Sequence, residues 1–302
     1  MKKLLYIILT IPLLNCEPKG TELVGHIGRP DISPDGEKIT FIYAQDASKN
    51  PWEIYSSDIS GKNVTQLTDF AEARIKKGAV WSPDGKKIAF HADIKNGAQI
   101  FSMDSSGKNL TQLTESNGYN VEPHWSPDGE QIIFNSMSED GKAQIFMMNA
   151  DGSDIRKLNG PFGDNWYPRI TSKNKIIFTS DFNHEAYYDI FLMNLDGSDV
   201  RALTSVKSIN WFPEYSPDES QIVFHSNRDD PKLNDSGDYN LYLINSGGTK
   251  LKRITDWPGQ ELHAKWHPSG KEVIFEWHNE KSMGLYRLNV LTGETKKIKL
   301  VY

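Results

Sequence analysis

The chain has 302 residues, of which 37% are hydrophobic and 25% are charged, and its formal net charge is -6. This composition excludes a disordered tail and a multispan membrane protein. An acidic chain also lacks the broad basic surface that nucleic-acid binding requires, so we expect no nucleic-acid partner.

The chain opens with the pattern of an export signal. Lys2 and Lys3 precede an apolar run over residues 4–14, which is too short to span a bilayer as a helix. Residues 13–16, Leu-Leu-Asn-Cys, resemble a bacterial lipobox. This resemblance implies that residues 1–15 are a lipoprotein signal peptide and that Cys16, the only cysteine, carries the lipid. An ordinary secretory signal with a coincidental cysteine is the alternative.

A lipid on Cys16 would anchor the protein to a membrane of the bacterial cell envelope, facing the periplasm or the cell surface. Residues 16–29 are then expected to form the tether. The residue after the cysteine does not decide between the inner and the outer membrane.

A turn sequence recurs along the rest of the chain at a spacing typical of propellers. Ser-Pro-Asp-Gly stands at residues 33–36, 82–85 and 126–129, and altered copies stand at 216–219 and 267–270. Each repeat continues into a short apolar strand with a phenylalanine at its end. These six phenylalanines, 44 to 51 residues apart, are Phe41, Phe90, Phe134, Phe178, Phe224 and Phe275.

Each repeat contains four expected strands. An aromatic residue or isoleucine marks the first strand, and the Ser-Pro-Asp-Gly turn leads into the second. An apolar third strand, such as residues 190–193, precedes an Asp-Gly hairpin signal and a short polar fourth strand. Residues 30–302 are therefore predicted to form an all-β, six-bladed β-propeller of four-stranded antiparallel blades. An open sandwich or solenoid would not require six units of nearly equal length.

The repeats resemble those of the TolB-type β-propellers, and the match is best over residues 121–158. The family's pattern is Pro-x-Trp-Ser-Pro-Asp-Gly-Lys, followed by Ile-x-Phe, Ile-Tyr-x-Met-Asn-x-Asp-Gly and Leu-Thr. The resemblance implies an envelope role, but it covers the propeller without the α/β domain that precedes it in TolB.

One face of such a propeller is expected to carry the loops that vary between repeats, and binding residues concentrate in loops of this kind. Aromatic residues with a polar group suit a protein anchor or a sugar-stacking platform. The alternative is that Trp166 and Trp211 pack beneath their own loops. The predicted binding residues on this face are Arg74, Tyr119, Trp166, Tyr167, Trp211, Phe212, Trp257 and His263.

A second group of polar residues precedes the first-strand aromatic or isoleucine and should line the central channel. Adjacent blades would pair Arg169 with Glu214, and ring closure would pair Lys265 with Asp31. Structural ion pairs and a polar channel that accepts a ligand are both open. The predicted channel residues are Asp31, His124, Arg169, Glu214 and Lys265.

No short spacing of metal ligands links the histidines, so no metal and no cofactor is expected. The chain also has no Gly-x-Ser-x-Gly elbow and no glycine-rich phosphate loop. The leading hypothesis is a lipid-anchored, non-catalytic scaffold that binds an envelope protein. The alternative is a carbohydrate-directed or metal-assisted enzyme at the channel mouth, with a glycan or small-molecule ligand, for which His124 and His225 would be candidates.

Overall fold

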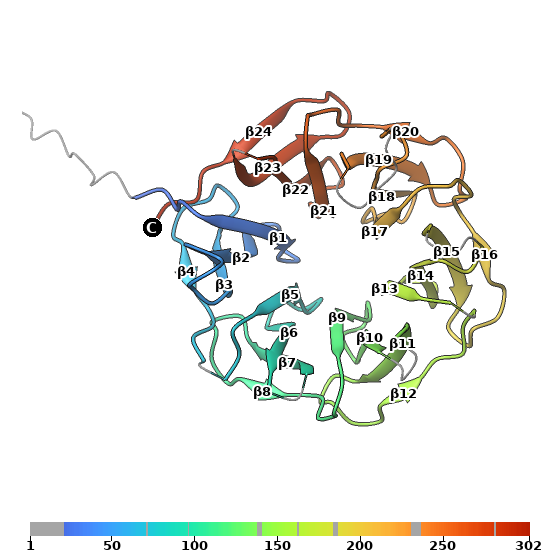
Figure 1. Ribbon diagram of the computed structural model, residues 1–302, viewed down its shortest axis with the longest axis horizontal. Helices are drawn as coiled ribbons and strands as arrows, with labels where there is room; N and C mark the ends of the chain where they lie inside the picture. Colours follow the sequence, from blue (N-terminus) through green and yellow to red (C-terminus); the bar gives the residue numbers. More distant parts are fainter. Residues whose placement is uncertain are drawn as a thin grey trace, which may run out of the picture.

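The structure is a computed structural model that describes residues 21–70, 72–95, 97–137, 141–161, 163–183, 187–230, 237–280 and 282–302. The predicted signal peptide and Cys16 lie outside these residues. Within them, the chain forms six separate four-stranded antiparallel sheets arranged radially around one axis, as Figure 1 shows. The predicted six-bladed propeller is confirmed.

The innermost strand of every blade lines the channel. These strands are β1 (His26–Ile32), β5 (Lys76–Trp81), β9 (Asn120–Trp125), β13 (Asn165–Ile170), β17 (Asn210–Tyr215) and β21 (Gln260–Trp266).

The second and third strands form the buried middle of each blade. The second strands are β2 (Lys38–Ala44), β6 (Lys87–Ile94), β10 (Gln131–Met137), β14 (Lys175–Ser180), β18 (Gln221–Ser226) and β22 (Glu272–His278). The third strands are β3 (Glu53–Asp58), β7 (Gly97–Asp104), β11 (Ala143–Asn149), β15 (Asp189–Asn194), β19 (Asn240–Asn245) and β23 (Met283–Asn289).

The outermost strands are short and polar. They are β4 (Thr65–Gln66), β8 (Thr111–Gln112), β12 (Arg156–Lys157), β16 (Arg201–Ala202), β20 (Lys252–Arg253) and β24 (Thr295–Ile298). Because such a strand exposes its backbone edge, polar side chains there disfavour pairing with another chain.

The core lies between neighbouring blades. All six second-strand phenylalanines are fully buried. Each pairs with an aromatic residue of the third strand; Phe41, for example, pairs with Tyr55. Apolar clusters then join adjacent blades, for example Ile177 of β14 with Phe224 of β18. Stacked sheets buried on both faces account for the continuous apolar sequence of the third strands.

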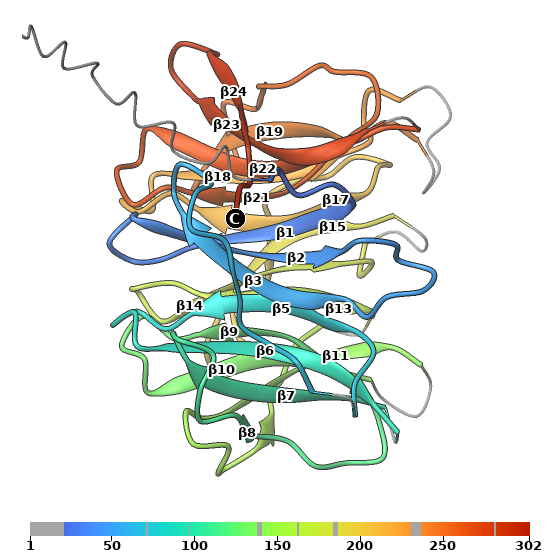
Figure 2. The ribbon, with the colours of Figure 1, turned by 90° about the vertical axis from the view of Figure 1, so that its left-hand side faces the viewer.

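The two faces of the propeller carry different connections, as the side view in Figure 2 indicates. The Ser-Pro-Asp-Gly turns lie on one face, where Gly36 adopts a φ of 77° and donates to Ser33. The opposite face carries the blade-to-blade linkers and the loops between second and third strands, and we call it the linker face. No helix long and apolar enough to cross a membrane occurs among the described residues.

The ring closes without exchanging a strand between its ends. Blade six is complete with β24, and Glu22 forms a single antiparallel bridge with Val301. Leu23 is buried in the core between blades six and one, and its N–H donates to the Leu300 carbonyl at 2.8 Å. Residues 22–29, which the sequence analysis assigned to the tether, therefore already contribute to the fold.

Candidate functional site

A β-bulge interrupts every innermost strand at the same position. The residue at the bulge has a positive φ, between 50° and 63°, in all six blades. Glycine adopts this conformation freely, whereas for other residues it costs about 1–2 kcal/mol. We call this set the bulge ring, and its members are Arg29, Gly78, Glu122, Tyr167, Phe212 and His263.

Second-strand side chains of the preceding blade hold the bulges in place. The N–H of Glu122 donates to His91 Nδ1 at 3.3 Å, and the N–H of Tyr167 donates to Asn135 Oδ1 at 2.9 Å. The Arg29 N–H likewise donates to the carboxylate of Glu276. These contacts satisfy backbone donors that the bulge removes from the sheet ladder.

The side chains of the bulge ring meet across the channel. The Arg29 guanidinium pairs with Glu122 and lies 5.3 Å from the centroid of the Phe212 ring. Phe212 also packs against Tyr167, with centroids 3.6 Å apart and the rings tilted by 30°, and its centroid lies 4.1 Å from that of His263. Arg29 of blade one thus touches blades three and five, so the network joins blades that are not neighbours.

Burial and these charges set the protonation of the network. Burial opposes ionisation of Glu122, but Arg29 and His91 outweigh it and lower the pKa of Glu122 to about 2. Burial lowers the pKa of His91 to about 4 and also lowers that of His263. A neutral His91 is consistent with its role, because only an unprotonated Nδ1 can accept from the Glu122 amide.

A second ring lies two residues further along the innermost strands. Arg169 Nε is 3.2 Å from Glu214 Oε2, and Lys265 Nζ is 2.8 Å from the same oxygen and 3.5 Å from Asp31 Oδ1. Both ion pairs predicted from the sequence are present. His124 also lies here, and burial lowers its pKa well below the usual value.

A small cavity lies between these two rings. The cavity that remains between them is about 30 Å³ and is lined by Arg29, Glu122, Phe212, Glu214 and Lys265 among others. A space of this size holds one or two water molecules. The space between the two rings therefore has room for ordered water but not for a sugar or a peptide.

The predicted loop residues divide into two groups. Trp166, Tyr167, Trp211, Phe212 and His263 belong to innermost strands, so their assignment to loops was wrong. The bulge lets each strand begin several residues before the proline or aromatic residue that marks it in the sequence.

Within the strands, alternate residues have different surroundings. Tyr167 and Phe212 are buried in the channel, whereas Trp166 and Trp211 are half-buried on the linker face. The Trp166 indole N–H donates to Asp164 Oδ2 at 2.8 Å, and Tyr188 donates to the same oxygen at 2.7 Å.

The remaining predicted residues lie in linkers. Trp257 packs on Phe275 and Tyr286, with centroids 5.8 and 5.1 Å away, and so forms part of the blade-six core. Arg74 is exposed and donates to the Ser48 carbonyl at 2.6 Å. Tyr119 is 55% exposed, which makes it the most accessible aromatic residue of the predicted set.

The sequence analysis missed three charged residues of the channel network: Arg29, Glu122 and Glu276. A signal for two of them was present. In four repeats the bulge residue directly precedes a proline, as Arg29 precedes Pro30 and Glu122 precedes Pro123. Nothing in the local sequence marks Glu276, because its role depends on the next blade.

Among the described residues, no group of three or more His, Cys, Asp or Glu side chains is arranged to hold a metal ion. The Nδ1 atoms of His91 and His225 instead face the backbone amides of Glu122 and His263, at 3.3 and 3.4 Å.

Comparison with known proteins finds similarity to TolB β-propellers. Residues 27–187 match the family model described as the TolB beta propeller domain. A segment of 105 residues is 29% identical to the Tol-Pal system protein TolB of Alcanivorax borkumensis. That match covers 34% of this chain and 24% of the relative, so the chain matches about a quarter of the relative's length.

Solved structures share the fold at low identity. A protein assigned as TolB from Agrobacterium tumefaciens superposes with a TM-score of 0.68 at 22% identity, over 82% of this chain and 87% of that one. TolB from Acinetobacter baumannii gives 0.64 at 22% identity, over 79% and 56%. An oligogalacturonate lyase in complex with manganese gives 0.60 at 17% identity, over 90% and 78%. Propellers with different activities thus share this architecture.

Proposed function

Because the chain belongs to the TolB β-propeller family, we propose that it is a bacterial envelope protein whose propeller binds a protein partner and catalyses no reaction. The partner would contact the linker face around the channel mouth. The half-buried tryptophans Trp166 and Trp211 carry this proposal, together with the exposed Tyr119.

The aromatic residues at the mouth are held in fixed positions. The Trp211 ring lies 5.5 Å from that of Tyr167 and 5.6 Å from that of Tyr188, and Asp164 orients both Trp166 and Tyr188. Rigid aromatic side chains contribute strongly to protein interfaces because they lose little conformational entropy on binding. The small size of the cavity between the two channel rings favours contact at the rim over insertion between them.

The lipid anchor on Cys16 completes the proposal. Seven residue steps separate Cys16 from the buried Leu23, which corresponds to a reach of at most about 24 Å. Such a tether would keep the ring-closure side of the propeller close to the membrane. Metabolic labelling with an alkyne fatty acid should mark the wild-type protein and not Cys16→Ser, and an unlabelled wild-type protein would contradict the anchor.

Affinity capture from detergent-solubilised envelopes tests the binding role. Wild-type protein should retain a discrete partner, and Trp166→Ala combined with Trp211→Ala should lose most of it while keeping the wild-type melting temperature within a few degrees. Lys86→Ala, on the opposite face, is the matched control and should capture normally. Equal capture by all three proteins would refute the assignment to the linker face.

A further inference from the structure

The outer edge of the ring between blades six and one exposes apolar side chains. Among the described residues, the three most exposed large hydrophobic side chains are Leu291, Val24 and Tyr302, which are 82%, 79% and 59% exposed. Leu291 lies in the hairpin that leads into β24. Val24 and Tyr302 line one groove beside blade one. Exposed apolar side chains that gather on one part of a protein mark an interaction surface.

Lysine residues lie on the same segments. Three of them lie on or directly after the exposed strand β24, and the fourth lies in the hairpin between β3 and β4 of blade one. The C-terminal segment contacts this hairpin, because the Val301 N–H donates to the Gly61 carbonyl at 2.8 Å. We call the three apolar residues and the four lysines the closure edge, and its lysines are Lys62, Lys296, Lys297 and Lys299.

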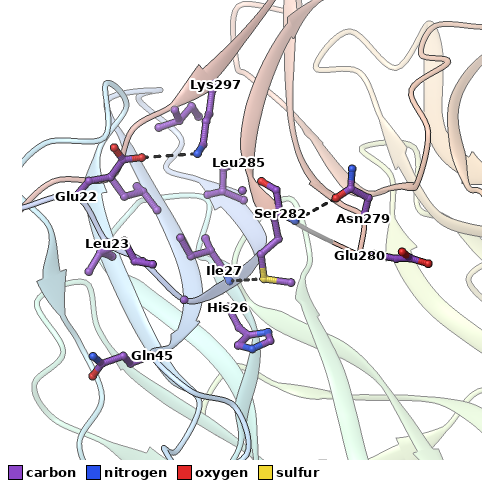
Figure 3. A pocket seen from close by; sticks show the side chains of 16 residues that line it. Glu22, Leu23, His26, Ile27, Gln45, Asn279, Glu280, Ser282, Leu285 and Lys297 are labelled. Atoms are coloured by element: carbon purple, nitrogen blue, oxygen red, sulfur yellow. Dashed lines mark hydrogen bonds and ion pairs between the residues drawn. The ribbon is translucent and has the colours of Figure 1, made fainter.

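Acidic residues neutralise only part of this positive charge. Lys296 pairs with Glu294 at 2.8 Å, and Lys297 lies 3.7 Å from Glu22, a pair that Figure 3 shows. Asp58 accepts backbone N–H groups of its own hairpin. The other two lysines form no ion pair within the part of the chain that the structure describes. The closure edge is therefore basic, although the net charge of the whole chain is -6.

The predicted lipid tether joins the propeller at this edge. The described chain begins at Thr21, whose carbonyl accepts from the Tyr302 N–H at 3.3 Å. Figure 1 shows the C-terminus at the outer edge of the ring, between blades six and one. Five residue steps separate Thr21 from Cys16, which corresponds to a reach of at most about 17 Å. A lipid on Cys16 would hold the closure edge within reach of the membrane surface.

The basic outer strands of other blades have a simpler explanation. The strands β12 and β20 are also basic, and positive charge on an exposed strand disfavours pairing with another chain. Ile155 and Leu251, which directly precede the basic residues of these strands, are 48% and 45% exposed. The closure edge differs because its apolar side chains are more exposed and because the tether begins beside it.

We propose that the closure edge rests on a membrane surface that contains anionic lipids, with its lysines on the lipid phosphates and its apolar side chains at the headgroup boundary. This proposal rests on the lipid anchor proposed above. Lysines combined with exposed apolar side chains are typical of segments that bind the membrane interface. Each lysine near an anionic membrane strengthens binding roughly fivefold.

The contact would orient the propeller on its membrane. Because the tether makes the contact intramolecular, a weak interaction is sufficient. The closure edge lies on the circumference of the ring, so the channel axis would run parallel to the membrane. The linker face would then open to the side, where a partner protein can reach it.

The test anchors the mature chain to vesicles chemically and therefore does not depend on natural lipidation. Cys16, the only cysteine, is coupled to a maleimide lipid in vesicles of phosphatidylcholine alone or of an equal mixture with phosphatidylglycerol. Acetylation by N-hydroxysuccinimide acetate, followed by mass spectrometry, measures the accessibility of each lysine. The closure-edge lysines should react at least threefold more slowly on the anionic vesicles. Lys157 and Lys173, on blades three and four, are controls and should react equally on both.

A charge variant provides the second arm. It replaces the three lysines at the end of blade six, and the protection of the remaining Lys62 should fall to the level seen on phosphatidylcholine alone. The matched control removes three positive charges from blades three and four and should leave Lys62 protected. Because these side chains lie at the surface, both proteins should fold. The variant is Lys296→Gln, Lys297→Gln and Lys299→Gln, and the control is Arg156→Gln, Lys157→Gln and Lys173→Gln.

Two results would overturn the proposal: equal acetylation of the closure edge on the two kinds of vesicle, and protection of Lys62 that persists in the charge variant. Protection that is equal on both vesicles and rises with the density of protein would show that a second copy covers this edge, which also contradicts the proposal. Fatty-acid labelling tests the natural anchor separately. A protected closure edge in a protein that cells do not label would refute the anchor alone, whereas an unprotected edge in a labelled protein would refute the membrane contact alone.

Discussion

Glu261 provides a sharp test of how burial acts within this propeller. It lies near the start of β21, is fully buried, and accepts from the Trp257 N–H at 2.9 Å. Burial raises its pKa to about 8, and the Trp257 amide and Arg253 only partly oppose this effect. The carboxyl group is therefore mostly protonated at neutral pH.

The consequence for stability follows from proton linkage. The folded-state pKa of Glu261 lies above the unfolded-state value of 4.5. The free energy by which this residue stabilises the folded state is therefore fully present below pH 4.5 and is lost as the pH rises toward 8. Integrating between these values gives a loss of about 1 kcal/mol at pH 5 and about 3 kcal/mol at pH 7, and the loss approaches about 5 kcal/mol near pH 9.

Glu261→Gln should remove this loss, because glutamine keeps the carbonyl acceptor for Trp257 and does not ionise. Urea unfolding at pH 5, 7 and 9 measures the effect, and the variant should gain stability over wild type that increases with pH. Glu37→Gln, on the exposed turn of blade one, is the matched control and should show no such trend. A difference between Glu261→Gln and wild type that is constant with pH would refute the reasoning.

Three further predictions concern the channel and the core. Arg29→Met should destabilise the protein by about 3–5 kcal/mol because it leaves Glu122 buried and unpaired; chemical denaturation should show that adding Glu122→Gln recovers much of the loss, and no recovery would mean that the pair does not act as a unit. The pKa of His91 is lowered to about 4, so the free energy by which neutral His91 stabilises the fold is fully present above pH 6.5 and is lost as the pH falls toward 4. Between pH 7.5 and 5, the free energy of unfolding of the wild type should drop by about 2 kcal/mol more than that of His91→Gln. Equal drops would show that His91 is not responsible. Trp257→Ala should lower stability by about 3 kcal/mol through lost packing in blade six while leaving partner capture unchanged. Reduced capture by a folded variant would show that Trp257 contacts the partner.

The blades were predictable because their signals are local and repeated. A Ser-Pro-Asp-Gly turn fixes a reversal of the chain, and a phenylalanine such as Phe134 marks the buried strand that follows. Six copies at nearly equal spacing leave a ring as the simplest arrangement. The same repetition predicted the pairing of Arg169 with Glu214, because equivalent positions of neighbouring blades must meet at the axis.

The bulge ring was not predictable from residue type. A positive φ is expected for glycine, and only Gly78 matches that expectation among its six members. Arg29 and Tyr167 adopt the conformation because a side chain of the preceding blade binds each bulge amide. That bond depends on how two blades pack against each other, and the sequence of a single repeat does not predict this packing.

The way in which the ring closes could also not be predicted from the sequence. The structure shows an isolated Glu22–Val301 bridge and starts β1 at His26. This pairing joins segments almost 280 residues apart.

Site-specific photocrosslinking in intact cells tests the central claim that the linker face binds a protein. Benzoylphenylalanine replaces the exposed Tyr119 on that face in one strain and Asp84 on the opposite face in another. We predict a discrete protein adduct from position 119, absent from position 84 and reduced when Trp211→Ala is added. No adduct from position 119, or the same adduct from both positions, would contradict the account.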